Sequence, residues 1–94
     1  MYARVVRFTD VNPERIEEIK TRVSQEEGPP EDVPSTGFRV YYDESQGTAV
    51  FVGYFASEED MKAGSEILDQ MDPSETPGTR ASVDMCEVKV EVDA

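Results

Sequence analysis

The segment Thr48–Phe55, TAVFVGYF, places the strongest constraint on how this chain folds. It is a nearly continuous run of apolar residues rich in β-formers, which predicts a strand that is covered on both faces. The chain has 94 residues, the size of one domain, so residues 1–94 are expected to form a single domain. A layer of helices covers one face of such a strand. The other face is therefore expected to meet something else.

The segments around this strand alternate between strand and helix patterns. Asn12 before Pro13, and Ser57 three residues before Asp60, are typical helix starts. The expected elements are, in chain order, a strand at Tyr2–Phe8, a helix from about Pro13 to Glu27, a hairpin of strands at Phe38–Tyr42 and Thr48–Phe55, a helix from Ser57 ending at Asp72-Pro73, and a strand at Ser82–Val92.

This order predicts an α+β, ferredoxin-like βαββαβ fold. Right-handed crossovers would place both helices on one face of a four-stranded antiparallel sheet with strand order 4-1-3-2. The Thr48–Phe55 strand is then central, and an apolar sheet face without helices usually marks an interface. We therefore expect a homodimeric α/β barrel joined through the sheet faces, with Val50, Val52 and Tyr54 as dimer-face candidates. Which side of each strand faces the helices stays open.

Charge and missing residue types exclude several classes of function. Nine Lys and Arg stand against 21 Asp and Glu, a net charge of −12. Such a surface repels nucleic acid and anionic membranes, so neither is an expected partner. Without histidine, and with Cys86 as the single cysteine, the chain can form neither an internal disulfide nor a Cys/His metal site. No apolar run is long enough to span a membrane and MYARVVRF lacks signal-peptide features, so a cytoplasmic protein is expected.

No motif of high chemical specificity occurs in the sequence, whether a phosphate-binding glycine loop, a zinc-protease helix or a nucleophile elbow. Cys86 lies in an expected strand beside Glu87, which disfavours a thiolate, so it is expected to be a small buried apolar residue. Neither a cofactor nor a metal is expected.

Strand arginines and tyrosines are the candidates for a ligand site. Arg4 and Arg7 fall on opposite sides of their strand, so at least one should lie in a covered layer and pair with a helix acid, across the dimer or with a bound anion. The hairpin tyrosines suit either a slot for a flat aromatic ligand or ordinary core and interface packing. The candidate ligand-pocket residues are Arg7, Arg39, Tyr41, Tyr54 and Phe55.

Gly64 is unusual because it lies in the middle of the second expected helix. Glycine there costs about 1 kcal/mol of helix stability relative to alanine. The position is expected either to permit close contact between helix and sheet or to leave room for a ligand above the sheet.

Nearly the whole chain resembles the antibiotic-biosynthesis-monooxygenase-like proteins of the dimeric α/β barrel superfamily. The resemblance rests on MYARVVRF followed by NPERIEE, on GTAVFVGYFASEEDMKAGSE and on SVDMCEVKVEV. It implies a ferredoxin-like protomer, a homodimer joined through the sheets, and a cavity between helices and sheet. Some members of this family oxidise polycyclic phenols to quinones with O₂ and no cofactor, and others cleave haem.

The resemblance carries over no catalytic residue. The haem-cleaving members rely on a histidine, an asparagine in the first strand and a tryptophan, and the quinone-forming members on asparagine, tryptophan and tyrosine. This chain lacks histidine and tryptophan, and its single asparagine, Asn12, is expected to cap a helix, so haem degradation is not expected. Two functions stay open: a cofactor-independent monooxygenase acting on a small aromatic or polyketide-like substrate, and a non-catalytic small-molecule-binding or regulatory dimer that uses the same cavity.

Overall fold

The computed structural model describes residues 1–26, 33–70 and 78–93, and for residues 23–26 the backbone alone. Its elements are, in order, β1 (Tyr2–Thr9), α1 (Pro13–Glu26), β2 (Gly37–Asp43), β3 (Thr48–Phe55), α2 (Glu58–Asp69) and β4 (Thr79–Glu87). The predicted α+β class and the βαββαβ order are confirmed. The predicted helix end at Asp72-Pro73 lies outside the described residues.

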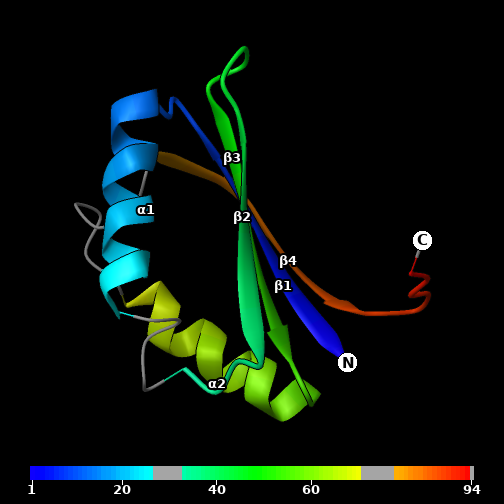
Figure 1. Cartoon of the computed structure of the whole chain (residues 1–94). Coiled ribbons are helices and arrows are strands. Elements are labelled where there is room, and N and C mark those ends of the chain that lie inside the picture. Colours follow the sequence, from blue (N-terminus) through cyan, green and yellow to red (C-terminus); the bar gives the residue numbers. More distant parts are fainter. Residues whose placement is uncertain (27–32, 71–77, 94) are drawn as a thin grey trace.

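The four strands form one antiparallel sheet in the order β2-β3-β1-β4, which is 4-1-3-2 when read from the opposite edge. Both helices lie on the same side of this sheet, and the C-terminal end of the chain lies on the other side (Figure 1). The sheet is open, so β2 and β4 each have one neighbouring strand.

Both helices begin at the polar residues that the sequence marks. The Arg15 backbone N–H donates to Asn12 Oδ1 at 2.8 Å, and the Asp60 N–H donates to Ser57 Oγ at 3.1 Å. Each bond satisfies a backbone donor that has no partner within its helix. The three acids that follow Ser57 also suit the positive end of the α2 dipole.

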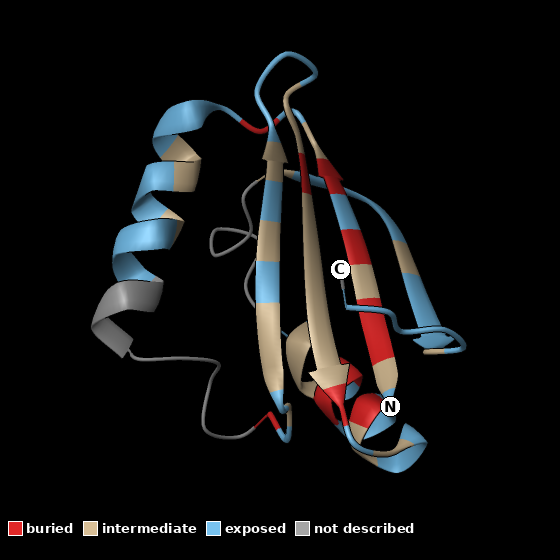
Figure 2. Ribbon diagram, turned by 45° about the vertical axis from the view of Figure 1, so that its right-hand side comes forward, coloured by how far each residue is buried: buried red, intermediate tan, exposed pale blue. Residues whose placement is uncertain are grey.

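Apart from Ala3, the buried apolar residues that the structure describes form two clusters between the helices and the sheet, along β1, at the ends of β3 and on α2 (Figure 2). The first consists of Val6, Phe8, Val11 and Ala49, and Ile16 of α1 packs against it. The second consists of Val33, Phe55 and Met61, so it joins β3 to α2.

The pairing register assigns each strand residue to one sheet face, because residues directly opposite on neighbouring strands point the same way. The helix-facing side carries the residues of both core clusters that belong to strands, together with Arg4 and Gly53. We call the other side the open face. Its members are Ala3, Val5, Arg7, Gly37, Arg39, Tyr41, Asp43, Thr48, Val50, Val52, Tyr54, Ser82, Asp84 and Cys86.

The prediction of a last strand at Ser82–Val92 is wrong at both ends, since β4 runs from Thr79 to Glu87. The Val88 N–H still donates to the Met1 carbonyl at 2.9 Å. After that bond the backbone leaves the sheet and returns across the open face (Figure 2). Val90 and Val92 are 80% and 82% exposed.

The prediction that Cys86 is buried is also wrong, because its side chain is exposed. The residue belongs to the open face of an edge strand, and along β4 only Val83 is even half-buried. A pattern of alternating residues cannot tell a strand at the edge of a sheet from one that is covered.

Candidate ligand-binding face

Arg4 occupies the middle of the helix-facing layer and is 6% exposed. Its Nε donates to Ser65 Oγ at 3.0 Å and its Nη2 to Asp69 Oδ1 at 3.1 Å. Arg80 Nη1 donates to the same Asp69 oxygen at 2.7 Å. Burial lowers the pKa of the Arg4 guanidinium, and the Asp69 carboxylate opposes this effect. The prediction that at least one of Arg4 and Arg7 lies in a covered layer is confirmed, and of the partners considered for it the structure shows the helix acid.

Gly64 permits close contact between α2 and the sheet. A Cβ at this position would lie 2.7 Å from Phe55 Cε1 and 3.2 Å from Val33 Cγ1. Phe55 is 1% exposed, so its ring fills the space above Gly64. Of the two roles considered for the glycine, the structure therefore supports close packing. Phe55, a ligand-pocket candidate from the sequence, is a core side chain at the second cluster.

The other four ligand-pocket candidates gather on the open face. One row across the sheet reads Tyr41, Val50, Arg7 and Ser82, and the next reads Arg39, Val52, Val5 and Asp84. Tyr54 follows Val52 by two residues on β3 and so lies diagonal to Arg39. The result is a strip of valines that is flanked by Tyr41 and Arg39 on the β2 side and by Arg7 and Asp84 on the other side.

The open face differs in charge from the rest of the chain. It carries two arginines, Arg7 and Arg39, against two acids, Asp43 and Asp84, so its charges balance while the whole chain has a net charge of −12. The Tyr41 phenol, as a hydrogen-bond acceptor, and the nearby Tyr54 phenol raise the pKa of the Arg39 guanidinium. A cation flanked by aromatic rings above apolar residues suits an organic anion that carries a ring.

A groove lies at the Gly37 end of the open face, between the sheet and the C-terminal segment. It has a volume of about 490 Å³, within the range of small-molecule sites. Its lining residues are Met1, Thr36, Gly37, Arg39, Tyr54, Val88, Val90, Glu91 and Asp93. Two of the ligand candidates, Arg39 and Tyr54, thus line a concave surface.

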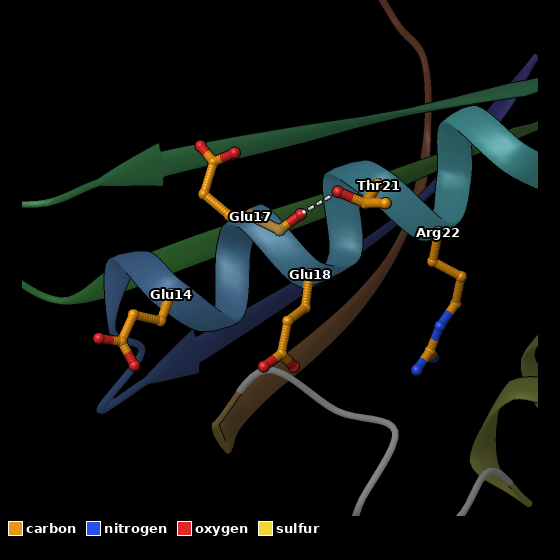
Figure 3. A pocket seen from close by; sticks show the side chains of 5 residues that line it. All are labelled: Glu14, Glu17, Glu18, Thr21 and Arg22. Carbon is orange, nitrogen blue, oxygen red and sulfur yellow. Dashed lines mark hydrogen bonds between the residues drawn. The ribbon is translucent and has the colours of Figure 1, made fainter.

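A second hollow follows the outer surface of α1 and is lined by Glu14, Glu17, Glu18, Thr21 and Arg22. These side chains are exposed and project to different sides of the helix, so they converge on no common point (Figure 3). The bond drawn there, from Thr21 Oγ1 to the Glu17 carbonyl at 2.9 Å, is internal to the helix. This hollow has no features of a ligand site.

Comparisons of the chain with known protein families, with curated proteins and with solved structures find no match. The resemblance to the antibiotic-biosynthesis-monooxygenase-like proteins therefore stays a prediction. No helix in the described part of the chain is long and apolar enough to cross a membrane. Within the same residues, no three metal-ligating side chains lie close enough together to hold an ion.

Sequence reasoning missed the partners of Arg4 and part of the open face. Nothing in the spacing of Ser65 and Asp69 marks them as partners for a residue more than 60 positions away. Glu91 and Asp93 enter the groove because the chain turns after Val88, which the strand-like pattern of this segment conceals. The alternation along β1 places Arg4 and Arg7 on opposite faces of the sheet, and that signal correctly separates their roles.

Proposed function

We propose that this protein is a non-catalytic binding protein, which holds a small aromatic acid on its open face and works as a homodimer. The proposal is supported by one observation above all. Two arginines and two tyrosines surround a strip of valines on a single sheet face, in a chain whose other surfaces are strongly acidic.

Each part of an aromatic acid finds a matching group on this face. A carboxylate accepts two parallel hydrogen bonds from a guanidinium such as that of Arg39. The ring packs on Tyr54 and the neighbouring valines, which offer apolar area. Tyr41 beside Arg39 offers a phenol that hydrogen-bonds a ring substituent. Arg7, two strands away, adds a second cation that favours an anionic ligand over a neutral one.

We favour binding over monooxygenase chemistry because the open face offers only phenols and two exposed carboxylates, Asp43 and Asp84, as bases for a phenolic substrate. The chain contains no histidine, and phenols, with an ordinary pKa of about 10, are poor bases at neutral pH. The helix-facing layer at α2 is filled by Phe55 and by the Arg4 ion pair.

A second copy of the chain is the partner that we propose for the valines of the open face. Val50 and Val52 are half-buried in a single copy, and burial of apolar area drives association. A net charge of −12 opposes self-association, but on the strands of the open face two arginines balance two acids.

Light scattering tests the homodimer. We expect a mass of twice 10.5 kDa for the wild type and 10.5 kDa for Val52→Glu. Thr21→Glu, which adds the same charge on the exposed surface of α1, should leave the dimer intact. A wild-type mass of 10.5 kDa at every protein concentration would contradict the homodimer.

Calorimetric titration with 4-hydroxybenzoate tests the ligand. Arg39→Gln should weaken binding by about 10-fold to 100-fold, because a hydrogen bond to a charged group contributes about 1.5–3 kcal/mol. Arg22→Gln, the same change on α1, should leave affinity unchanged, and neutral 4-hydroxybenzyl alcohol should bind more weakly than the acid. Equal binding to wild type and Arg39→Gln would refute this site. Oxygen uptake with an anthrone-type phenol would instead support the monooxygenase.

A further inference from the structure

We propose that the C-terminal segment, residues 89–93, forms an additional strand on β2 of a second copy of the chain. This inference rests on the homodimer proposed above. Lys89, Val90, Glu91, Val92 and Asp93 alternate between charged and β-branched residues, the pattern of a strand with one covered face. In a single copy the described backbone of these residues makes no hydrogen bond after the one at Val88. Val90 and Val92 are at least 80% exposed.

The outer edge of β2 is suited to receive such a strand. As an edge strand, β2 leaves one row of backbone N–H and C=O groups unused by the sheet, and an extended segment can pair with such a row. Its helix-facing side presents the half-buried apolar residues Val40 and Tyr42. Its other side presents Arg39 and Asp43, which carry opposite charges.

One antiparallel register places complementary side chains next to each other on both faces of β2. With Lys89 opposite Asp43, Asp93 falls opposite Arg39, and both pairs join opposite charges. Val90 and Val92 then fall opposite Tyr42 and Val40, on the apolar side. Cross-strand pairs of these kinds stabilise a sheet. A shift by one residue moves every charged side chain of the segment to the apolar side of β2.

The chain cannot make this pairing with its own β2. Val88 is bound to Met1 next to the Gly37 end of the sheet, on the β4 side. Asp43 lies at the opposite corner, about 14 Å away across three strand spacings and about 20 Å away along the strand. Lys89 follows Val88 directly, and one residue spans at most about 3.8 Å. The β2 that receives the segment therefore belongs to another copy.

The direction of the segment agrees with packing through the open faces. After β4 it crosses the end of its own sheet towards Gly37 and Thr36, roughly perpendicular to the strands (Figure 2). Two sheets that pack face to face with their strands near right angles are a known arrangement. In that arrangement β2 of the partner runs alongside the crossing segment. Asp93 then reaches Arg39 of the partner subunit and competes there with an acidic ligand.

Disulfide trapping between two single-cysteine variants tests the pairing. In a Cys86→Ser background, which removes the one native cysteine, Asp93→Cys is mixed with Arg39→Cys under mild oxidation. We expect a covalent product of twice 10.5 kDa that contains one copy of each variant. Asp93→Cys mixed with Glu58→Cys, an exposed position on α2, should give no such product. An intrachain disulfide in the double variant together with no product in the mixture would overturn the inference.

Deletion of residues 89–94 gives an independent test. It should raise the dimer dissociation constant at least about tenfold, since several cross-strand pairs are lost. It should also strengthen 4-hydroxybenzoate binding, because Arg39 loses its competitor. If the deletion left the dimer dissociation constant unchanged and no disulfide product formed, this inference would be refuted, but the open-face dimer would not be contradicted. A monomeric wild type would refute both, whereas loss of ligand binding alone would leave the strand pairing intact.

Discussion

Replacement of Gly64 by alanine tests the packing between α2 and the sheet. It has two opposing effects on stability: a gain in helix propensity and a larger loss from steric overlap with core side chains. In an open helix position alanine would stabilise the chain by about 1 kcal/mol relative to glycine. Here the new Cβ would lie 2.7 Å and 3.0 Å from two carbons of the Phe55 ring and 3.2 Å from Val33 Cγ1. Optimal carbon–carbon separation is about 3.5–4.0 Å, so the ring would have to move by about 1 Å.

Movement of the Phe55 ring is costly because the ring is 1% exposed and packed among core residues. Overpacking of a core costs about 1–3 kcal/mol. With an overpacking cost of about 1.5–3 kcal/mol, offset by about 1 kcal/mol of helix propensity, we expect Gly64→Ala to lower the free energy of unfolding by about 0.5–2 kcal/mol. For a domain of this size that is a drop in Tm of about 2–16 °C.

Denaturant unfolding at fixed protein concentration, followed by circular dichroism, provides the measurement. Ala63→Gly, the reverse change at the exposed neighbouring position, measures the propensity effect in the same helix and should destabilise by about 1 kcal/mol. Phe55→Leu should reduce the cost of Gly64→Ala, since it removes the ring atoms that the new Cβ meets. If Gly64→Ala stabilised the chain by as much as Ala63→Gly destabilises it, the described contact would be refuted.

Three further outcomes are expected. Asp69→Asn should destabilise the chain by about 1–3 kcal/mol in chemical unfolding because it leaves the buried Arg4 without its carboxylate, and Arg4→Met should cost less since it removes the buried cation as well. Ser45→Ala should raise the pKa of Asp43 in a carboxyl NMR titration, because the Ser45 hydroxyl is the main cause that lowers it, and an unchanged pKa would contradict this. Since the folded-state pKa of Asp43 is depressed, its contribution to stability is present above pH of about 4 and is lost as pH falls through the folded-state pKa. In acid unfolding curves, Ser45→Ala should therefore reduce the amount of stability that is lost as the pH falls.

Local signals in the sequence were sufficient for the order of elements and for the helix starts. Asn12 and Ser57 act through bonds to a backbone N–H three residues away, so their role depends on nearby residues alone. The separation of Arg4 from Arg7 likewise follows from the two-residue repeat of a strand.

Features that depend on distant parts of the chain could not be predicted in this way. Cys86 and Val90 follow a strand pattern, but Cys86 is exposed because β4 is an edge strand, and Val90 because the chain leaves the sheet after Val88. The sequence suggests a common site for Phe55 and Tyr54 because they are aromatic neighbours on one strand, yet their side chains point to opposite faces of the sheet. The face that meets α2 depends on the packing of Gly64, which a single sequence does not reveal.

Two-dimensional ¹⁵N–¹H NMR during a titration with 4-hydroxybenzoate tests most directly the claim that the open face is the binding surface. We expect the largest shift changes at Gly37, Arg39 and Tyr54, and small changes at Gly64 and Ser65 on the helix-facing side. Changes concentrated at Gly64 and Ser65 would place the ligand between α2 and the sheet and contradict the account.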